Sequence, residues 1–127
     1  MPEPIVFISH FAIKEGKLDA LMETARPRAE ALEAGKPRTL VFLAYLDATR
    51  RTVSFLHAFA SAEDMDQHFE GAQERAASAY EFIEPRGWEI YGSPSDHAFG
   101  SLERAASSAG VPLNVQPEFL AGFLRMS

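Results

Sequence analysis

"SFLHAFASAEDMDQHF", residues 54–69, changes its hydrophobic pattern halfway, and this change decides the fold. The part up to residue 60 is apolar, with aromatic residues that are typical of a β-strand. Ser61 then stands three positions before Asp64, a capping-box pattern with aspartate in place of the usual glutamate, which predicts that a helix begins here. The segment also places His57 in the strand and His68 in the helix, so the two imidazoles could belong to one site.

The flanking segments extend this strand–helix unit in both directions. Residues 4–13 and 39–46 are strand-like, and the polar "DATRR" at 47–51 makes 39–46 and 52–60 a hairpin. Residues 17–34 carry one apolar stripe and predict a helix that Pro27 kinks or splits, with Gly35 as the residue after its end. The order of elements so far is strand, helix, strand, strand.

The helix that begins at Ser61 is expected to be long. Its buried face is predicted to hold Met65, Phe69, Ala72, Ala76, Ala79 and Ile83. Pro85 and Gly87 are expected to end it, and "GWEIYG" at 87–92 is a short further strand. The resulting order, βαββαβ, predicts an α+β ferredoxin-like fold with an antiparallel sheet.

The remaining residues, 93–127, are expected to extend this core. "SPSDHAFGSLERAASSAG" predicts a capped helix ended by Gly110, followed by "VPLNV" and by a last strand at 118–126. At 127 residues, the chain is expected to be one domain with a core at 4–92 and an extension at 93–127.

Composition excludes several classes of protein. The chain has 12 basic and 18 acidic residues, a net charge of −6, and no basic cluster, which argues against nucleic acid or an anionic membrane as a partner. It has no cysteine, so disulfides, thiol nucleophiles and cysteine metal sites are excluded. The N-terminus does not resemble a signal peptide, and the longest apolar run, 40–46, is far shorter than the roughly 20 residues of a membrane helix. We expect a cytoplasmic protein.

The strands are apolar on both faces, which bears on the oligomeric state. In residues 4–13, Ile5 and Phe7 lie on one side while Val6 and Ile8 lie on the other. Two helices cover only one face of such a sheet, so the other needs a different cover. A second copy related by a two-fold axis is the simplest cover, which predicts a homodimer with face-to-face sheets. The alternative is that the C-terminal extension folds back over this face.

Three segments resemble the antibiotic biosynthesis monooxygenase (ABM) family of dimeric α+β barrels. They are "FAIKEGK" at 11–17, "GKPRTLVFLAYLD" at 35–47 and "VSFLHAFASAEDMDQHF" at 53–69. In the last, Phe59 stands where the family has an aromatic residue, often tryptophan, and His68 stands at the helix histidine. The resemblance implies a pocket between sheet and helices in each subunit. Some members oxygenate quinols or phenolic polycycles there without metal or flavin.

Two departures from the family pattern refine this expectation. His57 occupies a strand position where relatives often carry glutamate. The haem-degrading branch uses an asparagine on the first strand and a tryptophan and a histidine on the second helix. In this chain Ser9 stands at the asparagine position, His68 at the tryptophan position and Ser78 at the histidine position. Because the axial histidine is missing, haem is not expected, and the prediction is that no cofactor is used.

His68 is the first candidate for catalysis. On a helical wheel it lies at the edge of the buried stripe, where its ring can reach both a cavity and water. Asp64 lies one turn earlier and can hydrogen-bond the ring, an arrangement that prepares a histidine as a general base. The alternative is a surface pair in which Asp64 serves only the helix cap.

The other candidates lie on strands. His57 shares a face with Phe59, and its alternative role is that of a core histidine bonded to a neighbouring strand. His10 alternates with Ser9 and is expected to face the dimer interior. Trp88 either lines a pocket or belongs to the core. No histidine pair has metal-ligand spacing, so no metal site is predicted.

Two functions follow from these residues. The first is a cofactor-independent monooxygenase acting on a small aromatic, a quinol or phenolic polycycle, with His68, His57 and Asp64 as catalytic residues. Its ligand-binding residues are Ser9, His10, Phe59 and Trp88. The second is a non-catalytic dimeric small-molecule-binding or structural protein of the same fold. It is favoured because His57 and Phe59 replace the glutamate and tryptophan that are common in the family.

Overall fold

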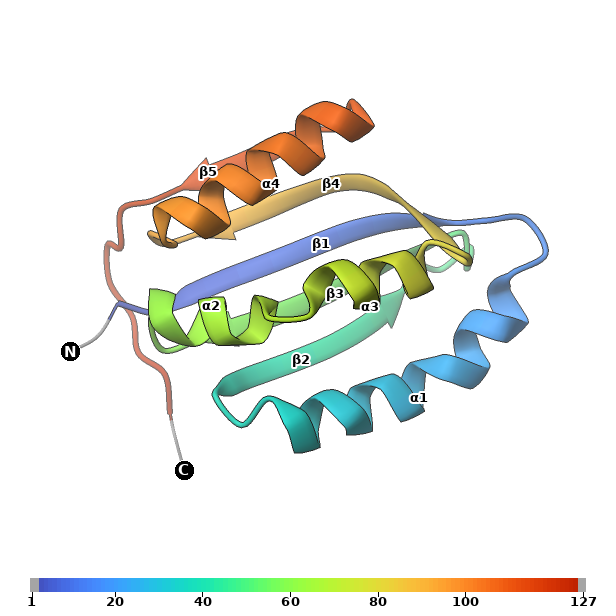
Figure 1. The fold of residues 1–127 in the computed structure, drawn as a ribbon, viewed down its shortest axis with the longest axis horizontal. Coiled ribbons are helices and arrows are strands. Elements are labelled where there is room, and N and C mark those ends of the chain that lie inside the picture. The colour runs from blue at the N-terminus through green and yellow to red at the C-terminus, as the bar shows by residue number, and fades with distance from the viewer. Residues whose placement is uncertain (1–2, 126–127) are drawn as a thin grey trace.

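The computed structural model describes residues 3–125, which form one five-stranded sheet with helices on one side (Figure 1). In chain order the elements are β1 (Ile5–Ile13), α1 (Leu18–Gly35), β2 (Thr39–Leu46), β3 (Thr52–Phe59), α2 (Ala62–Phe69), α3 (Ala72–Ala79), β4 (Ile83–Tyr91), α4 (Asp96–Ala109) and β5 (Leu113–Gln116). None of the helices in this range is both long and apolar enough to cross a membrane.

The strand order is β2-β3-β1-β4-β5. The first four strands pair antiparallel and form the predicted βαββαβ ferredoxin-like core, which confirms the α+β fold. The predicted helix–strand extension is also present, as α4 and β5. However, β5 lies parallel to β4, so the sheet is not antiparallel throughout.

All helices cover the face of the sheet that we call the helix face. It carries Ile5, Phe7, Ser9 and Phe11 of β1, which are buried, whereas the residues that alternate with them are half-buried. Two clusters of buried side chains fill the space under the helices. One contains Ile5, Phe7, Phe59, Met65, Trp88, Ile90, Leu102 and Ala106, and the other Phe11, Leu21, Val53 and Ile83.

The helix predicted to begin at Ser61 does begin there but is shorter than expected. The Ser61 hydroxyl accepts a hydrogen bond from the Asp64 backbone N–H at 3.2 Å, which confirms the cap. Glu70 is extended, and Gly71 has a φ of 77°, a left-handed conformation in which glycine is not strained. The chain therefore turns between α2 and α3, and the single long helix was wrong.

The start of β4 also corrects the prediction. Ile83 was expected on the helix and Pro85 and Gly87 at its end, but all three lie within β4. Pro85 is tolerated there because the pairing between β1 and β4 shifts register between His10 and Phe11, and proline fits such irregular positions. Ile83 is still buried, in the cluster beneath α1 and α3.

Two smaller expectations also change. Helix α1 is not split at Pro27, which lies exposed inside it, and Gly35 is its last residue rather than the one after it. The strand predicted at 118–126 is not formed over 118–125, and Met126 is outside the described residues. The last strand is instead β5, which begins inside the "VPLNV" segment and ends at Gln116.

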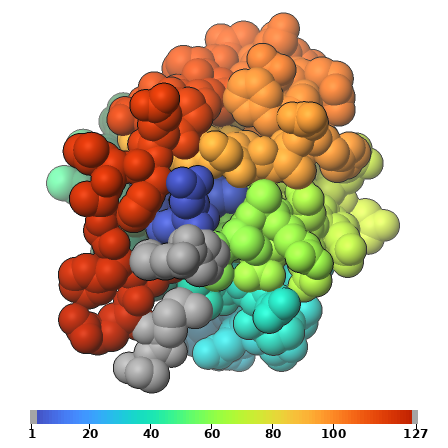
Figure 2. Space-filling model, turned by 90° about the vertical axis from the view of Figure 1, so that its left-hand side faces the viewer, coloured from blue at the N-terminus to red at the C-terminus, as the bar shows by residue number. Residues whose placement is uncertain are grey.

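The second face, which we call the open face, is only partly covered. Residues 117–125 pass beside the start of β1, where Figure 2 shows the C-terminal segment in red next to β1 in blue. A pocket of about 240 Å³ separates this segment from Val6 and Tyr91. Farther along the face, Leu43 and Tyr45 of β2 are 45% and 58% exposed. The C-terminal extension thus covers one end of the open face, and the opposite corner stays free.

Candidate functional site

His57 and His68 meet on the helix face, with ring centroids 5.0 Å apart and planes at 75°. Strand register places His57 there, because it pairs with Phe7 of β1 on one side and with Phe42 of β2 on the other. The cap at Ser61 fixes the start of α2 and so brings His68 over β3. Sequence alternation alone could not decide which way His57 points, since both sheet faces are apolar.

Aromatic rings surround the two imidazoles. Phe7 and Phe42 each lie 5.2 Å from His57 between centroids. Phe59 lies 5.3 Å from His68, and Phe69 follows it on α2 at 6.0 Å. His57 and His68 are only 7% and 4% exposed. Such a low-dielectric environment disfavours the charged form of both histidines.

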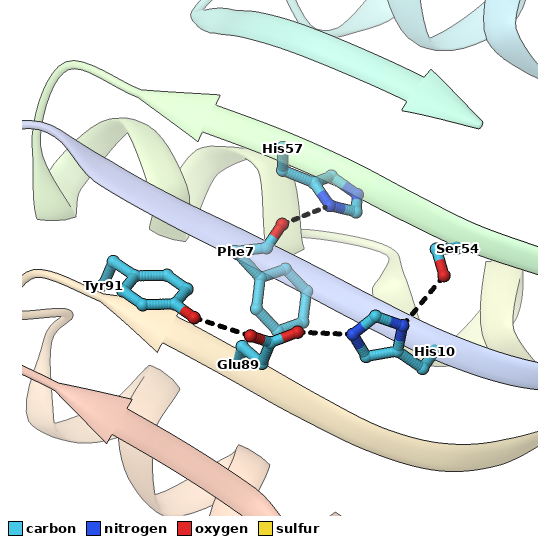
Figure 3. Close-up of polar contacts among 6 residues, drawn as sticks. All are labelled: Phe7, His10, Ser54, His57, Glu89 and Tyr91. Carbon is cyan, nitrogen blue, oxygen red and sulfur yellow. Dashed lines mark hydrogen bonds and ion pairs between the residues drawn. The ribbon is translucent and has the colours of Figure 1, made fainter. Parts of the chain in front are cut away.

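The tautomer of His57 follows from its hydrogen bond. Its Nδ1 lies 3.1 Å from the Phe7 carbonyl oxygen (Figure 3), which can only accept, so Nδ1 carries the proton. Burial lowers the pKa of His57 to about 4, although the hydrogen bond to the Phe7 carbonyl oxygen alone would raise it. His57 is therefore neutral at pH 7, with an unprotonated Nε2.

His68 is neutral for the same main reason. Burial lowers its pKa to about 3, with further contributions from His57, Arg75 and Lys36. Its Nδ1 lies 2.7 Å from the hydroxyl oxygen of Thr39, the first residue of β2. When Nδ1–H donates to this oxygen, Nε2 of His68 is left as a proton acceptor.

The two cations that act on His68 are held at the C-terminus of α2. The Lys36 ammonium donates to the carbonyl oxygens of Gln67 and Glu70 at 2.8 and 3.0 Å. Arg75 donates to the carbonyl oxygens of His68 and Glu70 at 2.5 and 2.9 Å. Cations are favourable at the negative end of a helix dipole, so these side chains stabilise α2 while keeping the histidine neutral.

Asp64 does not orient His68 as the sequence suggested. Its carboxylate lies 3.2 Å from Nε of Arg38, and among the described residues the ring of His68 bonds to Thr39 instead. The two side chains are therefore one helical turn apart but have different partners. Asp64 instead ties the start of α2 to the loop before β2.

A surface cleft of about 180 Å³ lies against His68. Its lining residues are Gly35, Lys36, Pro37, Arg38, Thr39, Gln67, His68 and Glu70. His68 thus stands between the cleft and the buried His57. The basic side chains of Lys36 and Arg38 outnumber the one acidic side chain, that of Glu70, on the wall of this cleft, so it suits a ligand that carries or develops negative charge.

The remaining predicted site residues lie elsewhere. Ser9 and Trp88 are register partners on the helix face, buried farther along the sheet beside Phe11. His10 projects from the open face, as its alternation predicted. The structure therefore brings together His57, His68 and Phe59. Trp88 belongs to the same buried cluster as Phe59, but neither it nor Ser9 lines the cleft beside His68, and His10 lies on the other face.

Thr39, Lys36 and Arg75 were not recognised from the sequence. Each lies on a different element from His68, and only the packing of the loop before β2 and of α3 against α2 brings them close. Within residues 3–125, no group of three or more His, Cys, Asp and Glu side chains could hold a metal ion.

Neither a protein-family model nor a curated protein sequence matches the chain. Solved structures do. MupZ from Pseudomonas fluorescens aligns over 97% of this chain and 95% of its own, with a TM-score of 0.71 and 13% identity. A protein from Nitrosomonas europaea, provisionally named an antibiotic biosynthesis monooxygenase, aligns over 73% of this chain and 92% of its own, with a TM-score of 0.61 and 23% identity.

A third structure, from Bacteroides thetaiotaomicron, bears the same provisional name and aligns over 65% of this chain and 81% of its own, with a TM-score of 0.55 and 16% identity. At these identities the likeness concerns the fold. The fold is that of the ABM-like proteins, as the resemblance implied.

Proposed function

We propose that the chain is a cofactor-independent monooxygenase that acts on a small quinol or phenol bound in the cleft beside His68. The observation that carries this proposal is the contact between two buried, neutral histidines, one of which also lines a basic cleft. Perturbed titratable groups at a cleft are a frequent property of active sites. The provisional names of two structural neighbours point to the same chemistry.

His68 is the proposed base. It is unprotonated at pH 7, and in the tautomer whose Nδ1–H donates to the Thr39 hydroxyl oxygen, its Nε2 can accept the phenolic proton. The phenolate that forms beside the imidazole ring of His68 favours the charged imidazolium. Its negative charge therefore opposes the effect of burial on the pKa of His68. Lys36 and Arg38 stabilise the phenolate from the cleft wall.

The phenolate then gives one electron to O₂, and the two radicals combine into a peroxide on the ring. Loss of water from this peroxide leaves one oxygen atom on the product, so a hydroquinone and O₂ become a hydroxyquinone and water. The neighbouring aromatic rings exclude water from the buried side of the site. His57 contacts the ring of His68 and is a positioning residue.

The size of the cleft restricts the substrate. A cavity of roughly 150 Å³ accommodates benzene, and the cleft here measures about 180 Å³. The cleft is therefore large enough for a single-ring quinol, which we propose in preference to the phenolic polycycle that the family resemblance implied. Asp64 is assigned a supporting role, because its carboxylate pairs with Arg38 on the wall of the cleft.

Oxygen consumption with a panel of single-ring quinols tests the proposal, with product mass as a second readout. We expect His68→Gln to lower the rate about 100-fold or more, since a general base contributes this much. Thr39→Val should lower it less, through loss of the hydrogen bond that holds the ring of His68 at Nδ1. His97→Gln is the matched control, because His97 is exposed on α4. Full oxygen consumption in His68→Gln would show that His68 is not the base.

We also propose that two copies pack through the open face, as the sequence pattern predicted. Leu43 and Tyr45 are exposed on the corner that residues 117–125 leave free, and a second copy related by a two-fold axis would remove both side chains from water. Sedimentation should give a dimer for the wild type and a monomer for Leu43→Glu. A wild-type monomer at micromolar concentration would contradict this proposal.

The alternative function is a non-catalytic binding protein with the same cleft. It is favoured by the small volume of the cleft and by its polar lining of Lys36, Arg38 and Thr39. Calorimetric titration with the same quinols separates the two functions. Binding without oxygen consumption would support this alternative.

A further inference from the structure

The proposed substrate cleft gathers positive charge on a protein that is acidic as a whole. The chain has a net charge of −6. Lys36 and Arg38 nevertheless line this cleft, and Arg75 is bonded to the carbonyl oxygens at the end of α2 beside it. Of the nearby carboxylates, Glu70 lines the cleft and Asp64 pairs with Arg38. A small positive region on an acidic surface attracts small anions from solution.

Arg38 has unused donors for such an anion. A guanidinium carries five N–H groups in a planar fork. The N–H on Nε points to the Asp64 carboxylate at 3.2 Å, and the side chain of Arg38 is 61% exposed. Among residues 3–125, no other side chain or backbone oxygen bonds to the two terminal nitrogens. The end of the fork is therefore accessible to a ligand.

Asp64 holds this fork in a fixed orientation. Its side chain is only 11% exposed, and its backbone N–H donates to the Ser61 hydroxyl at the start of α2. Because Asp64 occupies Nε, the free edge of Arg38 consists of Nη1 and Nη2. Two parallel N–H bonds from such an edge match the two oxygens of a carboxylate, a geometry that the ammonium group of a lysine does not offer.

The anion-binding edge lies close to the proposed base. Thr39 directly follows Arg38, and its hydroxyl oxygen lies 2.7 Å from Nδ1 of His68. The Cα atoms of two consecutive residues are about 3.8 Å apart, and all three residues line the same cleft. A ligand that contacts both Arg38 and His68 therefore needs its ionised group and its hydroxyl on one small ring.

We infer that the molecule bound in this cleft is a single-ring quinol with a carboxylate on the ring, and that Arg38 binds this carboxylate. The inference rests on the proposed function, since it uses the same cleft and the same base. One hydroxyl of the ring lies at Nε2 of His68, and the carboxylate stays at the exposed mouth of the cleft. Lys36 donates two of its three N–H groups to backbone carbonyls and keeps the third for the phenolate oxygen.

This assignment gives the basic cleft a role before any proton is transferred. A neutral quinol becomes charged only after His68 takes its proton, so the cations act on it only from that point. A carboxylate is attracted at the first encounter and is bound equally in the ground state and the transition state. Arg38 is therefore a specificity-determining residue whose loss should raise KM more than it lowers kcat.

The cleft also stays accessible in the dimer proposed above. Its lining comes from the end of α1, the connection from α1 to the first residue of β2, and the end of α2. These segments belong to the helix side of the molecule, whereas the second copy would pack on the open face.

Calorimetric titration with two ligands of equal shape tests the inference. Gentisate is a hydroquinone with one ring carboxylate, and gentisamide is its neutral amide. We expect gentisate to bind the wild type about tenfold more tightly, a modest value for charge-assisted hydrogen bonds because Arg38 is exposed. This preference should decrease in about 0.5 M sodium chloride, which screens exposed charges.

Three variants assign the preference to the fork. Arg38→Gln should remove it, and Arg38→Lys should keep only part of it, since the charge remains but the parallel bonds are lost. Arg104→Gln is the matched control, because Arg104 is exposed on α4 and the variant changes the net charge by the same amount as Arg38→Gln. Circular dichroism confirms that each variant is folded.

Oxygen consumption with the same two ligands separates this inference from the proposed function. In Arg38→Gln the KM for gentisate should rise about tenfold, with a smaller change in kcat. Equal binding of gentisate and gentisamide by the wild type, or an unchanged preference in Arg38→Gln, overturns the inference, and oxygen consumption with neutral quinols would still support the monooxygenase. Tight binding of gentisate that depends on Arg38 but consumes no oxygen supports the carboxylate site and contradicts the monooxygenase.

Discussion

The buried histidine pair should make the protein unstable in mild acid. An unfolded histidine has a pKa near 6.5, whereas burial lowers the pKa of His57 to about 4 and of His68 to about 3. The unfolded chain therefore binds protons more readily than the folded one, so the stabilisation is complete above pH 6.5 and decreases as the pH falls toward 4. From pH 7 to pH 5 the loss is about 2 kcal/mol per histidine, or about 4 kcal/mol for the pair.

Urea unfolding followed by circular dichroism at pH 7 and pH 5 measures this loss. The His68→Gln variant should lose about 2 kcal/mol less than the wild type over the same interval, and a double variant with His57→Gln should show almost no loss from this source. His97→Gln, on the exposed side of α4, should keep the wild-type dependence. A wild-type loss below about 1 kcal/mol would refute the conclusion that the folded protein keeps both rings neutral.

Three other variants test individual features. Arg75→Gln should raise the pKa of His68, because the guanidinium at the end of α2 contributes to its low value, and NMR titration of the ring measures this shift. Ser61→Ala removes the cap of α2 and should lower the free energy of unfolding by about 1 kcal/mol, measured with urea. Gly92→Ala should lower the melting temperature, at a cost of roughly 1–3 kcal/mol, because Gly92 has a φ of 111° and an added Cβ would lie 2.8 Å from the Pro4 carbonyl oxygen.

The parts of the fold that depend on local chemistry could be predicted from the sequence. The Ser61 cap and the polar connection between β2 and β3 were both correct, since each depends on a few adjacent residues. The break after α2 was missed because the alanine-rich α3 continues the same helical pattern, and the left-handed Gly71 was the one available signal. The parallel β5 was missed because a four-residue strand carries little pattern of its own.

In the candidate site, too, the features that depend on adjacent residues were predicted, and those that depend on distant parts of the chain were not. The sequence identified His57 and His68 but could not orient His57, because that depends on register with two other strands. It assigned Asp64 to His68 on local spacing, whereas Arg38, from a different part of the chain, forms the ion pair. The bond between His10 and Glu89 joins residues 79 positions apart, which no local pattern can indicate.

The order of strands has a consequence for the handling of the protein. Strand β2 lies at the edge of the sheet, and its sequence, "TLVFLAYL", contains no charge, no proline and no glycine. Such an edge leaves backbone donors and acceptors that can pair with another chain, and native proteins usually blunt it with lysine or proline. Concentrated samples should therefore aggregate through this strand first, and a lysine on its exposed side is the substitution that we would use to improve solubility.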